Sequence, residues 1–300
     1  MAVNLAEPAR RGLLVGTGAA LTLSALGVPA GWPFVGKMYV HQYDPQTFFD
    51  GAETWLAVRD DVAATRRNVE ALVAEVSVTS WRSDDGRAFQ RRMDAYLADL
   101  RGIELRAVVT ALTLYTVGAA LAAMILFQFL VAAVMAAVAA WVLTAAVTPV
   151  SLAGARILAT RSLIKLFEGY QSVESLLDAL LHGCAAALGA AVAVDLGGEA
   201  ARGDYGGVHD LAAATFAQGP MLVWGTANRV ERDLTAHGLD GRRPGSGLWS
   251  SARAGAPLPP GLPQLAGAKA VNDIATGSQT ATGRYVPEQA ADGTYSFPWE

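Results

Sequence analysis

Few residues of this 300-residue chain have the type and spacing that catalysis needs. Two short pairs come closest. Asp84 and Asp85 are adjacent carboxylates, a combination that can serve general acid–base catalysis. His182 lies two residues before Cys184 and could activate it as a nucleophile. The two aspartates, however, fall where a helix is expected to begin, and acidic side chains there complement the helix dipole. The His–Cys pair lacks a third partner within an apolar helical pattern. We therefore interpret both pairs as structural.

A further polar group lies beside a glycine-rich stretch and consists of Asp204, Tyr205, His209 and Asp210. The glycine pairs at 197–198 and 206–207 are not followed by Gly-Lys-Ser/Thr, so they do not form a phosphate-binding loop. The four histidines lack metal-ligand spacing, and one cysteine cannot form an internal disulfide or a Cys-based zinc site. We therefore expect a solvated loop here. We also expect that the protein has no catalytic residue, no cofactor and no metal, and that it is not an enzyme.

The composition narrows the class of partner. The net charge is −4, so there is no basic surplus of the kind that nucleic-acid binding requires. Hydrophobic residues make up 52% of the chain and charged residues only 17%, whereas about a quarter of the residues of a soluble domain are charged. We expect no nucleic-acid partner, and extensive burial of helices in lipid or in protein.

The segment 107–155 contains no charged residue and no histidine. One crossing of a bilayer needs about 20 apolar residues, so the segment is long enough for two. The loop between two crossings would have to be Leu126–Leu130, which is itself apolar and so speaks against them. Basic residues flank it on both sides, which favours two cytoplasmic ends. These residues are Arg101, Arg106, Arg156, Arg161 and Lys165. The alternative is a central helix, or helices, buried in a soluble all-α bundle.

Residues 1–37 have the order of a secretory signal. Arg10 and Arg11 precede a long uncharged run, and Val28-Pro29-Ala30 resembles a small-residue cleavage site. A membrane anchor and a non-native extension ahead of a start at Met38 are the alternatives.

Residues 38–106 contain two amphipathic stretches with heptad spacing, joined by a polar turn. The first seam consists of Trp55, Val58, Val62, Val69, Leu72 and Val76, with Thr65 as its one polar position. The second consists of Phe89, Met93, Tyr96, Leu100, Ile103 and Ala107. Because each seam would be buried by a partner helix packed along it, the pattern predicts that the two helices pack on each other as an antiparallel helical hairpin, a short coiled coil. No helix-stopping residue follows, so the second helix should continue into the apolar segment.

The turn resembles that of the actinobacterial Trp-X-Gly (WXG) family of helical hairpins associated with type VII secretion. Trp81 is followed eight residues later by Phe89 and seven after that by Tyr96, with the small residue Gly86 between them. The family's glycine, two residues after the tryptophan, is Ser83 here. The resemblance implies that Trp81 and Phe89 pack at the turn. It also implies a partner hairpin in a homo- or heterodimer, and contact with the type VII secretion machinery.

The family's export signal, Tyr-x-x-x-Asp/Glu, has one match, from Tyr170 to Glu174. The match lies far downstream of the hairpin, so we interpret these two residues as part of a helix surface.

The remaining sequence predicts a smaller helical region over 156–240, with helices at 152–169 and 172–194 and one or two more over 208–237. Residues 241–300 are rich in proline and glycine and should form a disordered or loosely packed tail that buries little. We therefore expect an all-α protein, and a non-enzymatic, type VII secretion-associated one that acts by helical association at or across the membrane. It should be membrane-associated or secreted, at the cell envelope. The alternative is an exported effector with a C-terminal toxin or a pore-forming activity.

Overall fold

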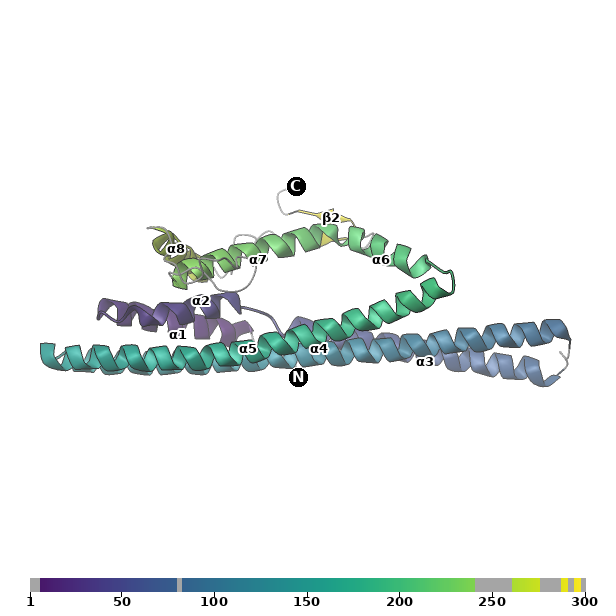
Figure 1. The fold of residues 1–300 in the computed structure, drawn as a ribbon, viewed down its shortest axis with the longest axis horizontal. Helices are drawn as coiled ribbons and strands as arrows, with labels where there is room; N and C mark the ends of the chain where they lie inside the picture. Colours follow the sequence, from purple (N-terminus) through teal and green to yellow (C-terminus); the bar gives the residue numbers. More distant parts are fainter. Residues whose placement is uncertain (1–5, 80–82, 241–260, 276–286, 291–293, 298–300) are drawn as a thin grey trace. The chain divides into compact units, whose positions relative to one another are not determined.

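The computed structural model describes residues 6–79, 83–240, 261–275, 287–290 and 294–297 (Figure 1). In this part of the chain almost every residue is helical, and the sheet consists of two strands of two residues each. The predicted all-α class is confirmed. The described chain divides into two compact units. Unit 1 comprises 44–121 and 178–198, and unit 2 comprises 6–43, 122–177 and 199 onward.

Unit 1 contains α3 (Gln46–Thr79), the first part of α4 (Asp84–Ala145) and the last part of α5 (Pro149–Ala201). α4 begins where the sequence supplies a cap, since Ser83 Oγ accepts a hydrogen bond from the Gly86 amide at 3.2 Å. Asp84 and Asp85 lie in the first turn of the helix, in keeping with their interpretation as helix-start residues. α4 then runs without interruption to Ala145, because no proline occurs before Pro149.

The uncharged stretch of α4 ends in a turn at residues 146–148, just before Pro149, and the loop that two crossings would need at Leu126–Leu130 is not formed. Thr148 caps α5 by accepting a hydrogen bond from the Ser151 amide at 3.2 Å, and Pro149 occupies the first helical position. Nothing in Leu126–Leu130 breaks a helix. The two helices expected at 152–169 and 172–194 are likewise one helix, α5, because no proline separates them.

In unit 2 the N-terminal segment is part of the packed core. It forms α1 (Ala6–Ala25), a 3-10 turn (Pro29–Gly31) and α2 (Trp32–Val40). Its most deeply buried apolar residues are Leu13, Ala20, Leu23, Val28, Phe34, Val35 and Met38. Gly12 lies against the backbone of Phe129 on α4, close enough that a side chain there would be in van der Waals contact.

The rest of unit 2 contains α6 (Gly206–Ala217), α7 (Gly219–Asp240), α8 (Leu262–Ala275), β1 (Glu288–Gln289) and β2 (Tyr295–Ser296). The strands are antiparallel, with Glu288 opposite Ser296. The C-terminal half of α7 packs on α2, and α8 packs on α7. α8 buries Ala266, Ala270 and Asp273, so the expectation that the tail buries little is wrong for this helix.

Two helices of the described residues, α4 and α5, are long and apolar enough to cross a membrane, although core helices of soluble proteins share both properties. Of the most apolar eighteen-residue window, 39% is buried in α4 and only 6% in α5. α5 therefore leaves its apolar window open to its surroundings, which is consistent with membrane association.

Candidate functional site

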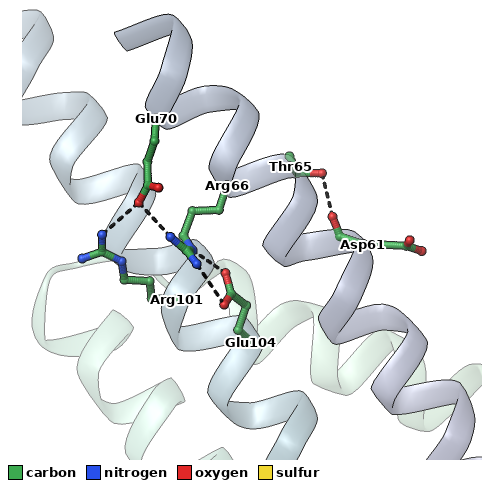
Figure 2. A network of polar contacts seen from close by, with 6 residues as sticks. All are labelled: Asp61, Thr65, Arg66, Glu70, Arg101 and Glu104. Carbon is green, nitrogen blue, oxygen red and sulfur yellow. Dashed lines mark hydrogen bonds and ion pairs between the residues drawn. The ribbon is translucent and has the colours of Figure 1, made fainter. Parts of the chain in front are cut away.

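A network of ion pairs joins α3 to α4 in unit 1 (Figure 2). Arg66 of α3 donates from Nε to Glu104 Oε1 of α4 at 2.5 Å, and from Nη1 to Glu70 Oε1 at 2.8 Å. Arg101 of α4 donates to the same Glu70 oxygen at 2.9 Å. Each helix thus contributes one arginine and one glutamate, and the pairs link α3 to α4. The hydrogen bonds from Arg66 and then Arg101 lower the pKa of Glu70.

Most of the predicted seam of α3 is exposed. Four of its six apolar side chains are exposed by 41% (Trp55), 37% (Val58), 63% (Leu72) and 42% (Val76), while Val62 and Val69, near Arg66, are half-buried. Figure 2 shows Thr65 on the side of α3 away from Arg66, its hydroxyl donating to the Asp61 carbonyl at 3.0 Å. A step of one residue turns a helix face by about 100°. Arg66 and Glu70 therefore face α4, while four of the six apolar side chains of the seam stay exposed.

The predicted seam of α4 lies closer to the observed contact. Gly86, Leu100 and Ala107 are buried, and Phe89 and Met93 are half-buried. Tyr96 and Ile103 are exposed, and the next residues along, Leu97 and Glu104, are the more buried ones. Trp81 lies outside the described residues, so its packing at the turn stays a prediction.

A second polar group, which the sequence did not lead us to expect, joins α2 to α5 in unit 2. The Glu174 carboxylate pairs with Lys37 Nζ at 2.7 Å through one oxygen and with His41 Nε2 at 2.9 Å through the other. The His41 and Glu174 side chains are only 8% and 14% exposed. His41 Nδ1 is buried without a hydrogen-bond partner. A charged carboxylate so far from water needs both partners to offset its desolvation.

One turn earlier on α5, Tyr170 is fully buried and its hydroxyl accepts a hydrogen bond from Gln128 Nε2 of α4 at 2.8 Å. Phe34 of α2 packs edge-on against Tyr170, with ring centroids 6.0 Å apart. The interpretation of Tyr170 and Glu174 as helix-surface residues is therefore wrong. Tyr170 and Glu174 are four residues apart, and Leu163 and Leu177 continue the same helical spacing. This spacing could have identified the buried face of α5.

The other candidate groups make local contacts. His182 Nδ1 lies 2.7 Å from its own helix carbonyl at Asp178, and Cys184 is half-buried. Asp204 Oδ1 accepts a hydrogen bond from the Gly206 amide at 2.9 Å at the start of α6. Within the ranges that the structure describes, there is no group of three or more His, Cys, Asp or Glu side chains that could hold a metal ion. What these arrangements do chemically is to hold helices together.

Comparisons of the chain with models of protein families, with curated proteins and with solved structures find no match. The Trp-X-Gly resemblance therefore depends on the turn and its flanking seams alone.

Proposed function

We propose that this protein is non-enzymatic and works by helical association at the membrane, with the outward seam of α3 as its pairing surface. The exposure of Trp55, Val58, Leu72 and Val76 carries the proposal. Heptad-spaced apolar side chains are the pattern by which a helix binds another helix along its length. Since α4 is held by the Arg66 network, this seam is left for a second hairpin.

The partner in this proposal is a helical hairpin, from either a second copy or a related protein. Leaving four large apolar side chains in water is unfavourable by about 25 cal/mol for each Å² of apolar surface, and a partner helix would remove that cost. The type VII secretion machinery as a further partner follows from the family resemblance of the Trp81 turn, and so does a location at the cell envelope.

The membrane contact in this proposal comes from the apolar parts of α4 and α5. The exposed apolar side chains of α5 support it, and they include Ile157, Leu158, Ile164 and Leu176. Lipid chains would cover these side chains without requiring a polar partner. In the alternative, protein covers these side chains of α5. That alternative predicts that alkaline carbonate releases the chain from the membrane without detergent.

The pairing claim is tested by replacing Leu72 and Val76 together with lysine in the full-length protein. We would measure the oligomeric state by size-exclusion chromatography with light scattering, in detergent. Each protein is run alone and after co-expression with a hairpin protein encoded by a neighbouring gene. The wild type should be a dimer and this variant a monomer. Ala71→Lys, an exposed position beside the seam, is the matched control and should remain dimeric. A wild-type protein that is monomeric under both conditions contradicts the pairing claim.

The membrane claim is tested separately by alkaline carbonate extraction of cell membranes. We expect the protein to stay in the membrane pellet and to be released only by detergent. Release into the supernatant by carbonate alone refutes an integral membrane segment and favours the bundle interpretation.

A further inference from the structure

The turn between α4 and α5, in unit 2, carries large apolar side chains that are almost fully open to the surroundings. Val147 and Val150 are 86% and 84% exposed. Trp141 and Leu143, at the end of α4, are 44% and 56% exposed. An exposed apolar patch of this kind marks a contact with a partner or with a membrane.

The charges next to this turn are all of one sign. Residues 105–167 contain no aspartate or glutamate, whereas Arg156, Arg161 and Lys165 are exposed on α5. Within the described ranges no carboxylate pairs with Arg161 or Lys165. Arg156 donates from Nε to the Leu26 carbonyl oxygen at 2.5 Å and so joins α5 to the chain just after α1. The surface is therefore apolar at the turn and basic behind it.

The apolar and basic side chains follow each other along one face of α5. Val150, Ile157 and Ile164 recur every seven residues, and the two isoleucines are 56% and 50% exposed. Arg161 lies on the same face, one turn beyond Ile157. At the rise of an α-helix, Arg156 and Arg161 lie about 9 Å and about 17 Å along the axis from Val150.

These distances match half of a bilayer. The hydrocarbon core is about 30 Å thick, so one leaflet accounts for about 15 Å of it. A turn that entered more deeply would bring exposed arginines into the hydrocarbon, which is costly. At the depth of one leaflet Arg161 lies at the level of the head groups, and anionic head groups attract basic side chains.

We propose that residues 141–150 form a membrane tip that inserts into one leaflet of a bilayer containing anionic lipid, while Arg161 and Lys165 bind the head groups. The tip enters from the side on which the basic residues lie and does not cross. This inference rests on the proposed membrane contact, for which it names the lipid and the depth.

The depth is tested on full-length protein with Cys184→Ser and one new cysteine, Val147→Cys or Ser172→Cys, labelled with the fluorophore NBD. Ser172 is an exposed position of α5 beyond the basic residues. Each protein is diluted from detergent onto preformed vesicles of phosphatidylcholine and phosphatidylglycerol. We expect the label at position 147 to emit as in hydrocarbon and to be quenched by lipids that carry a spin label on the acyl chain. The label at position 172 should emit as in water and be quenched by external iodide.

Two results for the label at position 147 overturn the membrane tip. Emission as in water with quenching by external iodide means that the tip does not insert. Emission as in water without that quenching means that the tip has crossed to the vesicle interior. If the protein binds neither these vesicles nor cell membranes, the proposed membrane contact fails as well. If it binds both while this label stays in water, only the present inference fails.

The choice of lipid is tested with the double variant Arg161→Gln/Lys165→Gln. Its affinity for the anionic vesicles should fall at least tenfold, while its affinity for vesicles of phosphatidylcholine alone should stay the same. Arg67→Gln/Arg91→Gln removes the same charge from exposed positions of α3 and α4 and should bind the anionic vesicles like the wild type. An equal loss in both double variants overturns the assigned head-group contact, because binding would then follow net charge alone.

Discussion

At Gly36, α2 lies close against α7, and replacing this glycine with alanine should loosen that contact. A Cβ built on Gly36 lies 2.9 Å from the carbonyl oxygen of Ala236 and 3.5 Å from Leu239 Cβ. The first distance is shorter than real Cβ contacts, and the atom it meets belongs to the backbone, so no side-chain rotation can relieve it. One of the two helices must move, and the side chains buried between them must repack.

Two effects oppose each other in this substitution. Alanine is a better helix former than glycine by about 1 kcal/mol, which favours the variant. Forcing an extra group into a packed contact costs about 1–3 kcal/mol, which opposes it. Gly169→Ala in α5 isolates the first effect, because Gly169 is helical and no atom lies within 4 Å of its added Cβ. The free energies of unfolding of the two variants should therefore differ by about 1–3 kcal/mol, with Gly36→Ala the less stable.

Thermal unfolding followed by circular dichroism measures this difference. A change of 1 kcal/mol shifts the melting temperature of a chain of this size class by about 2–4 °C, so Gly36→Ala should melt several degrees below Gly169→Ala. Gly169→Ala should melt at or above the wild type. Equal increases in melting temperature for both variants would refute the close approach of α2 and α7 at Gly36.

Three other predictions concern the polar contacts. Gln128→Leu should lower the free energy of unfolding by about 1–3 kcal/mol, because it leaves the buried Tyr170 hydroxyl without its donor. The double variant Gln128→Leu/Tyr170→Phe should be close to the wild type in stability. Chemical denaturation measures both. Burial, together with the hydrogen bond that the Tyr39 hydroxyl donates to Asp273, raises the pKa of Tyr39 to about 12. The stability that Tyr39 contributes is therefore complete below the pKa of an unfolded tyrosine, near 10, and is lost as the pH rises through about 12. Ultraviolet titration should show a tyrosine with a midpoint near pH 12 that disappears in Tyr39→Phe; a midpoint near 10 would contradict this. The lowered pKa of Glu70 gives stability that is present above its unfolded pKa and lost as the pH falls through the folded value, and Glu70→Gln should remove this acid-dependent part of the unfolding curve.

Local signals in the sequence predicted the helices themselves well. The absence of proline before Pro149 predicted that the helix after the turn continues into the uncharged segment, as α4 does. Ser83, Asp84 and Asp85 marked the start of that helix through cap and dipole preferences. Pro149 was expected to end the uncharged run, and the turn between α4 and α5 lies just before it, with Pro149 at the first position of α5.

The sequence did not predict which helix faces meet, because charged and polar pairs between distant segments decide this. Heptad spacing selected the face of Thr65 and Val69 on α3, but Glu104 lies 38 residues beyond Arg66, and no local pattern reveals that pairing. Glu174 is likewise 133 residues from His41. α8 was missed because its contacts, such as the hydrogen bond from the Tyr39 hydroxyl to Asp273, join residues 234 positions apart.

Apolar side chains make up most of the buried core, yet some polar pairs lie between helices while part of the apolar surface stays exposed. Arg66 with Glu104 lies between helices in unit 1, and Glu174 with His41 does so in unit 2, whereas several leucines and valines of α3 and α5 are exposed. A chain that stayed alone in water would gain by the opposite arrangement, since apolar burial is the main favourable term in folding. Polar pairs are worth little net stability but fix which faces meet. We infer that they set the orientation of the helices, and that the apolar faces left outside obtain their stabilisation from a partner helix or from lipid.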